Sequence, residues 1–183
     1  MDYEKLRGTK TEANLFAAFA GESQARNKYT YYASQAKKQG FVQIAKIFEE
    51  TADNEREHAK MWYKLLHGGS VSGTEENLKD AAAGENYEHD VMYAEFAKVA
   101  HEEGFTKIAK LFEKVGDIEK SHADRYTRLL ENLRNNRVFE KESPLVWYCS
   151  NCGYLHEGNK APGVCPVCDH PQGFFHQKSE NYK

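Results

Sequence analysis

Apolar side chains recur at steps of three and four along most of the chain up to Asn135, the spacing typical of amphipathic helices. Glycines at 40 and 104 interrupt the pattern where the chain must turn. The predicted helices cover residues 10–38, 42–67, 74–102 and 106–135. Two helix starts carry the Ser/Thr-x-x-Glu spacing of a capping box, Thr9 with Glu12 and Ser72 with Glu75. No strand is predicted before residue 146.

The helical part of the chain is an internal duplication. Residues 41–66 and 105–130 are identical at 12 of 26 positions. The numbering offset between the copies is 63 where Gly21-Glu22 matches Gly84-Glu85, and it is 64 from Gly40 and Gly104 onward. Each copy therefore predicts a helical hairpin. Two hairpins that bury their apolar stripes against each other form an antiparallel four-helix bundle.

Glutamate and histidine interrupt the apolar stripes of these helices. The second helix places Glu55 and His58 in line with Ile44, Phe48 and Leu65, and the fourth helix repeats the arrangement. In the first and third helices, glutamates share a face with alanine and leucine. The residues expected to point into the middle of the bundle are Glu22, Glu55, His58, Glu85, Glu88, Glu119 and His122.

Buried carboxylates without a counter-charge are strongly unfavourable, so these side chains indicate bound cations. One Glu from each of two helices, with Glu-x-x-His from each of the other two, is the ligand set of di-iron and di-manganese carboxylate bundles. Oxygen ligands with one imidazole per metal favour iron or manganese over zinc or copper. A lone Glu-x-x-His is more often an exposed surface pair, but two copies in register weaken that interpretation.

Three further residues near these positions are Glu88, Tyr29 and Tyr93. Glu88 has Ala25 as its counterpart, so it breaks the internal symmetry and is interpreted as an extra ligand to one metal. Tyr29 and Tyr93 follow Glu22 and Glu85 by seven and eight positions. Both tyrosines could hydrogen-bond the ligands or could simply pack, and the sequence leaves this open.

The four cysteines form a separate cluster near the end of the chain, as Cys149-x2-Cys152-x12-Cys165-x2-Cys168. Two such pairs on tight turns predict a tetrahedral all-sulfur site for zinc or a single iron. Spacing alone favours a structural zinc ribbon, whereas a redox-active bundle on the same chain favours iron as an electron carrier. The predicted domains are the bundle (1–138), a linker (139–145) and the cysteine domain (146–183).

Charge and hydropathy exclude several classes of function. The chain of 183 residues has a formal charge of −3, from 25 basic and 28 acidic residues, without a Lys/Arg stripe that would suit nucleic acid. Apolar runs fall short of the roughly 20 residues of a membrane span, and the N-terminus lacks a signal-peptide pattern. Cysteines used as metal ligands fit a reducing compartment. We therefore expect a cytoplasmic protein that binds neither nucleic acid nor membrane.

The sequence resembles the rubrerythrin family over its whole length. The motifs that carry the resemblance are Gly21-Glu22-Ser23-Gln24-Ala25-Arg26, Glu55-Arg56-Glu57-His58, Gly84-Glu85 with Glu88, Glu119-Lys120-Ser121-His122, and both cysteine pairs. The resemblance implies a mainly α fold, with a ferritin-like four-helix bundle and a small C-terminal rubredoxin-like domain. It also implies two Fe in the bundle and one Fe in the four-cysteine site.

The resemblance further implies roles for individual residues. Glu55 and Glu119 would bridge the two irons, and Glu22 and Glu85 would each bind one. The remaining implied ligands are His122, on the iron that carries Glu85, and Glu88 and His58, which would exchange on the other iron upon reduction. Tyr29 and Tyr93 match family positions beside the site. The implied reaction is reduction of hydrogen peroxide to water, with electrons from rubredoxin or an NAD(P)H-dependent reductase passing through the four-cysteine iron.

The connection between residues 67 and 74 is short for a ferritin-like topology. Parallel second and third helices require it to cover roughly 35 Å along the bundle. Six residues, 68 to 73, reach only about 20–25 Å. We therefore predict a swapped homodimer, in which residues 1–67 of one chain complete a site with residues 74–135 of its partner. An up-down-up-down bundle would also accept the short connection.

Two other functions fit part of this pattern. A ferritin-like protein that oxidises and handles iron predicts slow peroxide turnover and does not require the cysteines. A zinc-ribbon scaffold with a purely structural bundle predicts a colourless protein. An oxidised iron-tetrathiolate site absorbs visible light, so colour and metal content separate these alternatives.

Overall fold

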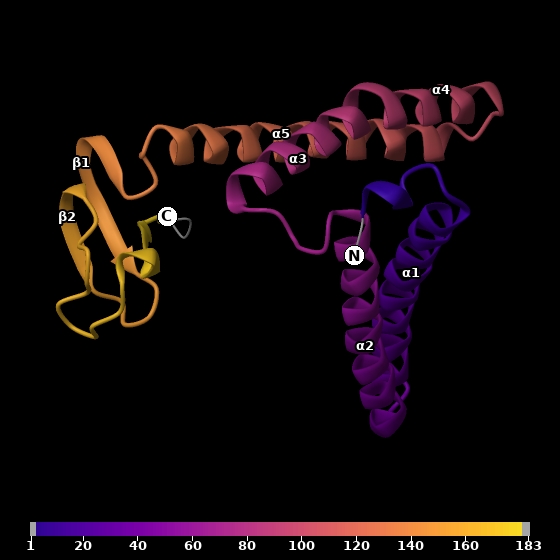
Figure 1. Ribbon diagram of the computed structural model, residues 1–183, viewed down its shortest axis with the longest axis horizontal. Coiled ribbons are helices and arrows are strands. Elements are labelled where there is room, and N and C mark those ends of the chain that lie inside the picture. The colour runs from indigo at the N-terminus through magenta and orange to yellow at the C-terminus, as the bar shows by residue number, and fades with distance from the viewer. Residues whose placement is uncertain (1–2, 181–183) are drawn as a thin grey trace. The chain divides into compact units, whose positions relative to one another are not determined.

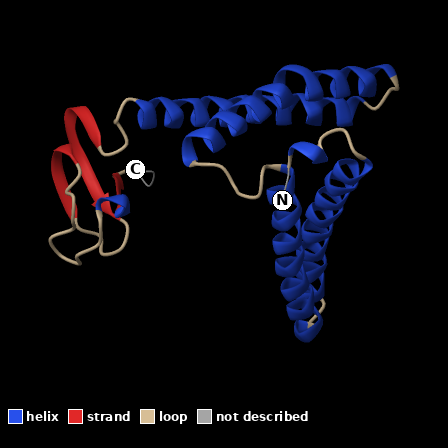
Figure 2. Cartoon of the chain, viewed as in Figure 1, coloured by secondary structure: helices blue, strands red, loops and turns tan. Residues whose placement is uncertain are grey.

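The computed structural model describes residues 3–180, and most of them are helical (Figure 2). The chain divides into two compact units, residues 1–72 and residues 73–183. The first unit contains one helical hairpin, preceded by a short 3₁₀ turn at Glu4–Leu6. The second unit contains the other hairpin and a small sheet. This is the set of elements expected for a ferritin-like, mainly α fold with a rubredoxin-like domain, and it confirms the predicted fold class.

Hairpin 1 consists of α1 (Lys10–Lys38) and α2 (Val42–Leu66), which run side by side (Figure 1). Thr9 caps α1 by accepting a hydrogen bond from the backbone N–H of Glu12 at 3.1 Å, and Gly8 N–H donates to the Glu12 carboxylate at 2.7 Å. Gly40 turns the chain at φ +85°, in the left-handed region that favours glycine. The predicted hairpin and the Thr9 cap are therefore confirmed, although the Glu12 carboxylate accepts from Gly8 N–H, whereas a full capping box would have it accept from Thr9 N–H.

Hairpin 2 is built from α3 (Thr74–Tyr87), the π-helical segment η2 (Glu88–Tyr93), α4 (Ala94–Glu102) and α5 (Thr106–Arg134). The first three follow one another along α5 (Figure 1). The predicted helix 74–102 is thus present but changes its hydrogen-bond pattern in the middle. The predicted capping box at Ser72 is wrong, because the residue at the N-cap is Gly73, which has no side chain to accept a hydrogen bond.

The π-helical segment explains why the repeat offset changes. The offset is 63 between Glu22 and Glu85, whereas it is 64 between Tyr29 and Tyr93. The two tyrosines nevertheless occupy equivalent places, since each ring lies 6.0 Å from a phenylalanine of the facing helix. A single extra residue in a helix is accommodated as a π-bulge. The second copy is thus one residue longer than the first between Glu85 and Tyr93, and η2 accommodates this residue without shifting the flanking helices out of register.

The π-helical segment packs closely against α5. His89 Nδ1 lies 2.8 Å from the carbonyl oxygen of Gly116, and a Cβ at Gly116 would lie 3.4 Å from Cβ of Tyr93. The counterpart of Gly116 in hairpin 1 is Ala52, which faces the regular helix α1. A residue without a side chain therefore gives the wider π-helical turn room to approach.

This packing predicts how substitutions at Gly116 behave. Gly116→Leu is expected to destabilise the protein by about 1–3 kcal/mol, because the added atoms press on Tyr93 and His89. Gly116→Ala serves as the matched control, since its single carbon meets only ordinary contacts and alanine favours helix. Urea unfolding followed by circular dichroism measures both. Equal stability of the two variants would contradict the close approach.

The cysteine domain contains a three-stranded antiparallel sheet of β1 (Glu140–Cys149), β2 (Leu155–Lys160) and β3 (Phe175–Gln177), in the order β2-β1-β3. A short 3₁₀ turn, Gln172–Phe174, precedes β3. Trp147, Ala161 and Phe175 form its core together with two of the cysteines. The expectation of no strand before residue 146 is wrong, because β1 begins at Glu140, which pairs with Lys160.

Candidate metal centres

Hairpin 1 brings three of the predicted ligands together. Glu22 of α1 and Glu55 and His58 of α2 offer ligand atoms that all lie within 4.8 Å of one another. His58 Nδ1 lies 2.8 Å from an oxygen of Glu55 and 3.8 Å from an oxygen of Glu22. The three-residue spacing places Glu55 and His58 on one face of α2, and the hairpin turn brings Glu22 opposite them.

Hairpin 2 repeats this geometry with the matching residues. Glu85 of α3 and Glu119 and His122 of α5 also gather within 4.8 Å. His122 Nδ1 lies 2.7 Å from an oxygen of Glu119 and 3.8 Å from an oxygen of Glu85. The glutamate side chains of both groups are only partly exposed to solvent. The duplication therefore supplies two equivalent half-sites, one in each hairpin.

The carboxylates of each half-site repel one another. The pKa of Glu22 is raised above its ordinary value, chiefly by a hydrogen bond to Glu55, then by burial and by the charge of Glu55. Burial is the main cause that raises the pKa of Glu85, followed by the hydrogen bond to Glu119 and its charge. Two close carboxylates share a proton unless a cation replaces it. The oxygen-rich donor sets, each with one imidazole, fit iron.

The raised pKa of Glu85 predicts the stability of the metal-free protein. Because folding favours the protonated form, the metal-free protein loses stability as pH rises from the unfolded value of 4.5 through the raised folded value, and the full penalty applies at neutral pH. Glu85→Gln is expected to raise the melting temperature of the chelator-treated protein at pH 7 by at least about 2 °C. Glu95→Gln, at an exposed position of α4, is the control.

The pH dependence gives a second check on this prediction. The difference between the Glu85→Gln variant and the original protein should shrink as pH falls through the raised folded pKa and should vanish below pH 4.5, where the carboxyl group is protonated in both the folded and the unfolded chain. Scanning calorimetry at several pH values measures it. A difference that stays constant from pH 7 to pH 4.5 would contradict the charge repulsion.

Glu88 and the two tyrosines lie around these half-sites. Glu88 belongs to η2, outside the group of three in hairpin 2, but its charge contributes to the raised pKa values of Glu85 and Tyr93. For Tyr93 the largest cause is burial. The Tyr29 ring packs against Phe48 in the corresponding place of hairpin 1. Whether Glu88 binds metal and whether the tyrosines hydrogen-bond the ligands stay predictions.

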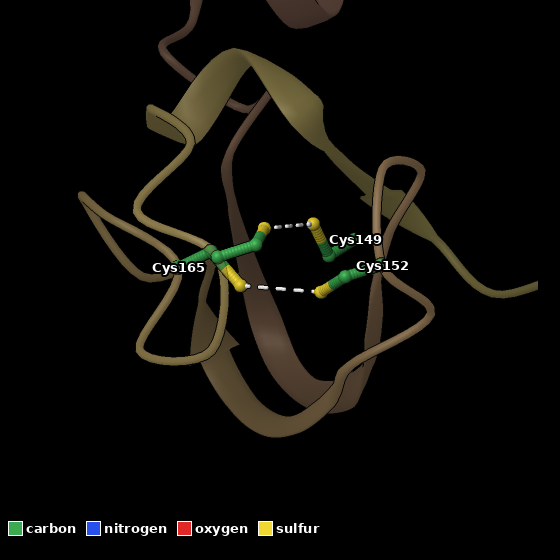
Figure 3. A group of neighbouring side chains, drawn as sticks. Cys149, Cys152 and Cys165 are labelled. Atoms are coloured by element: carbon green, nitrogen blue, oxygen red, sulfur yellow. Dashed lines mark hydrogen bonds between the residues drawn. The ribbon is translucent and has the colours of Figure 1, made fainter.

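The four cysteines converge in the small domain. Their sulfur atoms lie within 4.8 Å of one another, with 3.8 Å between Cys149 and Cys168 and 3.6 Å between Cys152 and Cys165. The labelled side chains in Figure 3 point toward a common centre. All four are free thiols and not disulfides. The pKa of Cys168 is lowered to about 6, first by the backbone N–H of His170, which favours the thiolate that binds metal.

The structure adds one residue near the half-sites that the sequence did not single out. Trp62 counts as an apolar residue of the α2 stripe, but its indole nitrogen is buried without a hydrogen-bond partner. The indole also acts on Glu22, whose pKa it lowers against the stronger effect of Glu55. Sequence periodicity places Trp62 on the correct face but says nothing about where its N–H points.

Comparison with known proteins finds relatives over most of the chain. The rubrerythrin family model matches residues 13–130, and the model of the rubrerythrin rubredoxin-like domain matches residues 147–176. Rubrerythrin-1 of Clostridium acetobutylicum is 48% identical over 98% of this chain and 100% of its own length. Rubrerythrin of Nitratidesulfovibrio vulgaris is 47% identical over 94% of this chain and 96% of its own. The solved structure of partially reduced nigerythrin is 33% identical, covers 93% of this chain and 87% of its own, and superposes with a TM-score of 0.36.

The matched regions contain all the candidate ligands. Residues 13–130 include both Glu/His groups, whose donors fit the ligands of a di-iron site, and residues 147–176 include the four cysteines of the rubredoxin-like site. None of the helices within residues 3–180 could span a membrane.

The rubrerythrin family model matches residues 13–130, and two relatives are 48% and 47% identical over nearly the whole chain. The chain therefore belongs to the rubrerythrin family.

Proposed function

We propose that this protein is a peroxidase that reduces hydrogen peroxide to water and protects the cell against oxidative stress. The observation that carries the proposal is the presence, on one chain, of two matching Glu/Glu/His groups and a four-cysteine site. The first set suits two irons and the second suits one iron that passes single electrons. Rubredoxin or an NAD(P)H-dependent reductase is the proposed electron donor, and the cytoplasm is the proposed location.

Each hairpin supplies part of the proposed set of metal ligands. Glu55 and Glu119 would bridge the two metals, Glu22 and Glu85 would each bind one, and His122 would bind beside Glu85. Glu88 and His58 would be alternative ligands of the other metal, according to the charge of the site. When bound, the two irons supply one electron each to peroxide. Carboxylates that change position with charge keep the site close to neutral in both states.

Reduction of one hydrogen peroxide to two waters consumes two electrons and two protons. Burial raises the pKa of Tyr93, so its hydroxyl stays protonated at neutral pH. A protonated phenol can donate a hydrogen bond to a ligand carboxylate or to hydrogen peroxide. We assign Tyr93, and by its equivalent place Tyr29, to orienting groups at this site.

We further propose that a complete di-iron site joins hairpin 1 of one chain to hairpin 2 of a second chain. The apolar faces of the hairpins support this: Ile44 and Ile47 of α2 are 48% and 56% exposed, and Ile108 and Leu111 of α5 are 46% and 61% exposed. Exposed faces of this kind are typical of surfaces that become buried in an assembly. The connection of seven residues between α2 and α3 is short for the ferritin-like path within one chain. We retain 1–138 and 146–183 as the proposed domains, and most of the predicted linker, 139–145, forms the first part of β1.

Mixed dimers test the exchange of hairpins. One variant loses the hairpin 1 ligands (Glu22→Ala with Glu55→Ala), and the other loses the hairpin 2 ligands (Glu85→Ala with Glu119→Ala). Each variant alone should be inactive. Refolded together, they should recover about one quarter of the original activity, because half of the random dimers are mixed and one of their two sites is intact. No recovery from mixed dimers would show that each site forms within one chain.

Anaerobic reduction followed by peroxide addition tests the reaction itself. The reduced protein is mixed with one equivalent of hydrogen peroxide while absorbance reports both iron centres. If the protein is a peroxidase, both iron centres should be reoxidised rapidly after the peroxide is mixed in. With a reductant present, the protein should then reduce peroxide repeatedly. Slow reoxidation by peroxide, together with rapid oxidation and retention of added ferrous iron, would favour the ferritin-like alternative. A colourless protein that contains only zinc would favour the structural scaffold.

A further inference from the structure

Trp62 carries a buried hydrogen-bond donor, its indole N–H, for which the described residues offer no acceptor within hydrogen-bond distance. It lies on the same face of α2 as Glu55 and His58, one turn beyond the histidine. Among the buried side-chain nitrogen and oxygen atoms of residues 3–180, the indole nitrogen of Trp62 is the one without a hydrogen-bond partner. A buried donor left unsatisfied is destabilising, so its presence points to a partner that arrives in another state of the site.

The carboxylate on which this donor acts is that of Glu22. The pKa of Glu22 is raised overall, chiefly by its hydrogen bond to Glu55, but the indole N–H acts in the opposite direction and favours the charged carboxylate. Glu22 offers one ligand oxygen to the group that it forms with Glu55 and His58, whose ligand atoms lie within 4.8 Å of one another. A carboxylate has two oxygens, so a cation bound at this group leaves the second oxygen of Glu22 available to accept a hydrogen bond from another donor.

We propose that Trp62 is a positioning residue for the metal held by hairpin 1, and that its indole N–H donates a hydrogen bond to the Glu22 oxygen that does not face the metal. The inference rests on the proposed function in one respect, since it takes Glu22 as a metal ligand. A carboxylate that binds metal through one oxygen is fixed in direction by a donor on the other. Indole N–H is a donor only, so it cannot compete with the carboxylate for the metal.

The two metal positions are consequently unequal. Trp62 and Tyr126 are equivalent in the repeat, at an offset of 64. Hairpin 1 therefore places an indole N–H beside its half-site, whereas hairpin 2 has a phenol at the corresponding position. An indole donates without accepting, whereas a phenol can do both. The metal beside Glu22 should thus depend on the residue at position 62 while the metal beside Glu85 does not.

Nuclear magnetic resonance of protein labelled with ¹⁵N at the tryptophan indoles tests this directly. The chain has two tryptophans, and Trp147 provides the internal control because its N–H already donates to the carbonyl of Gly158 at 3.0 Å. Zinc serves as a diamagnetic probe, with the cysteine site filled first. Further zinc should move the Trp62 N–H resonance downfield and slow its exchange with solvent at least about tenfold, while Trp147 changes little.

The outcomes separate this inference from the function on which it rests. Zinc that fills the bundle sites without altering the Trp62 N–H would overturn the role of Trp62 and leave the di-iron site intact. Failure of the bundle to bind zinc or ferrous iron at all would overturn the proposed function, and the role of Trp62 with it.

Metal affinity of two variants provides a second test. Trp62→Phe keeps an aromatic ring but removes the donor. It should lower the affinity for one of the two bundle metals about 10- to 100-fold. Trp62→Tyr puts back a donor and should recover part of that loss. Tyr126→Phe, the matched change in hairpin 2, should leave the metal beside Glu22 unaffected. Equal affinities in Trp62→Phe and the original protein, measured by competition with a chelator, would overturn the inference.

Discussion

Glu55→Ala is expected to remove peroxidase activity by at least about 100-fold and to lower the bundle iron below two per chain. Loss of a group that merely orients a metal ligand lowers metal affinity or activity about 10- to 100-fold, so loss of a proposed bridging ligand should lower them further. The Glu55 carboxylate lies 2.8 Å from His58 Nδ1 and within 4.8 Å of a Glu22 oxygen, so its removal opens the whole half-site of hairpin 1. Steady-state peroxide reduction and iron analysis measure the two effects.

The matched control for this variant lies two positions away on the same helix. Glu57 is exposed and pairs with Arg56 and Lys60, and its pKa is lowered first by the Arg56 hydrogen bond. Glu57→Ala should leave iron content and activity nearly unchanged, because surface substitutions of this kind have small effects. If Glu55→Ala keeps both bundle irons, or if Glu57→Ala loses them equally, the assignment of the α2 face is wrong.

Cys152→Ser is expected to disconnect the bundle from its electron supply. Loss of one thiolate opens the four-cysteine site, and so small a domain depends on its metal for folding. Turnover with an NAD(P)H-dependent reductase should fall by at least about 100-fold. The bundle reduced chemically with dithionite should still react with one equivalent of peroxide at nearly the original rate, because its ligands lie on the helices.

A neighbouring residue controls for general damage to this loop. Ser150 donates a hydrogen bond to the carbonyl of Phe174 at 2.9 Å and is not a metal ligand. Ser150→Ala should cost about 1 kcal/mol of domain stability and leave reductase-linked turnover largely intact. Trp147 fluorescence reports folding of the domain, since this side chain is only 1% exposed. Unchanged reductase-linked turnover in Cys152→Ser would show that electrons do not pass through the cysteine site.

The helical hairpins and the grouping of their acidic residues could be predicted because both follow from periodicity. Glu55 and His58, three positions apart on a helix, must share a face, and the repeat places Glu119 and His122 in the same way. The hairpin turns at Gly40 and Gly104 then bring the facing helices together. The structure confirms these groupings, whereas the metal-binding roles of individual residues remain predictions.

The π-helical segment was not predicted, although the sequence contains its signal. The change of offset from 63 to 64 between Glu85 and Tyr93 requires one extra residue, and a helix absorbs such a residue as a π-bulge. Periodicity alone does not reveal it, because a single turn of different pitch leaves the apolar pattern nearly intact. The offset between repeats, compared residue by residue, would have located it.

Other differences arise where local sequence and tertiary structure compete. Ser72 matches the capping pattern, but α3 begins one residue later, with Gly73 at its N-cap. The strand from Glu140 lacks the alternation of apolar and polar residues, and its pairing with β2 comes from the fold of the domain. The buried N–H of Trp62 depends on how α1 and α2 pack, which no spacing rule describes.

The central claim is that the acidic side chains inside the two hairpins hold a pair of irons, and anomalous X-ray diffraction from crystals of the iron-reconstituted protein tests it most directly. Two iron peaks should appear among the helices, one beside Glu22, Glu55 and His58 and one beside Glu85, Glu119 and His122, with a third peak among the four cysteines. Iron found only at the cysteines, with the glutamates of both hairpins turned toward solvent, would contradict the account.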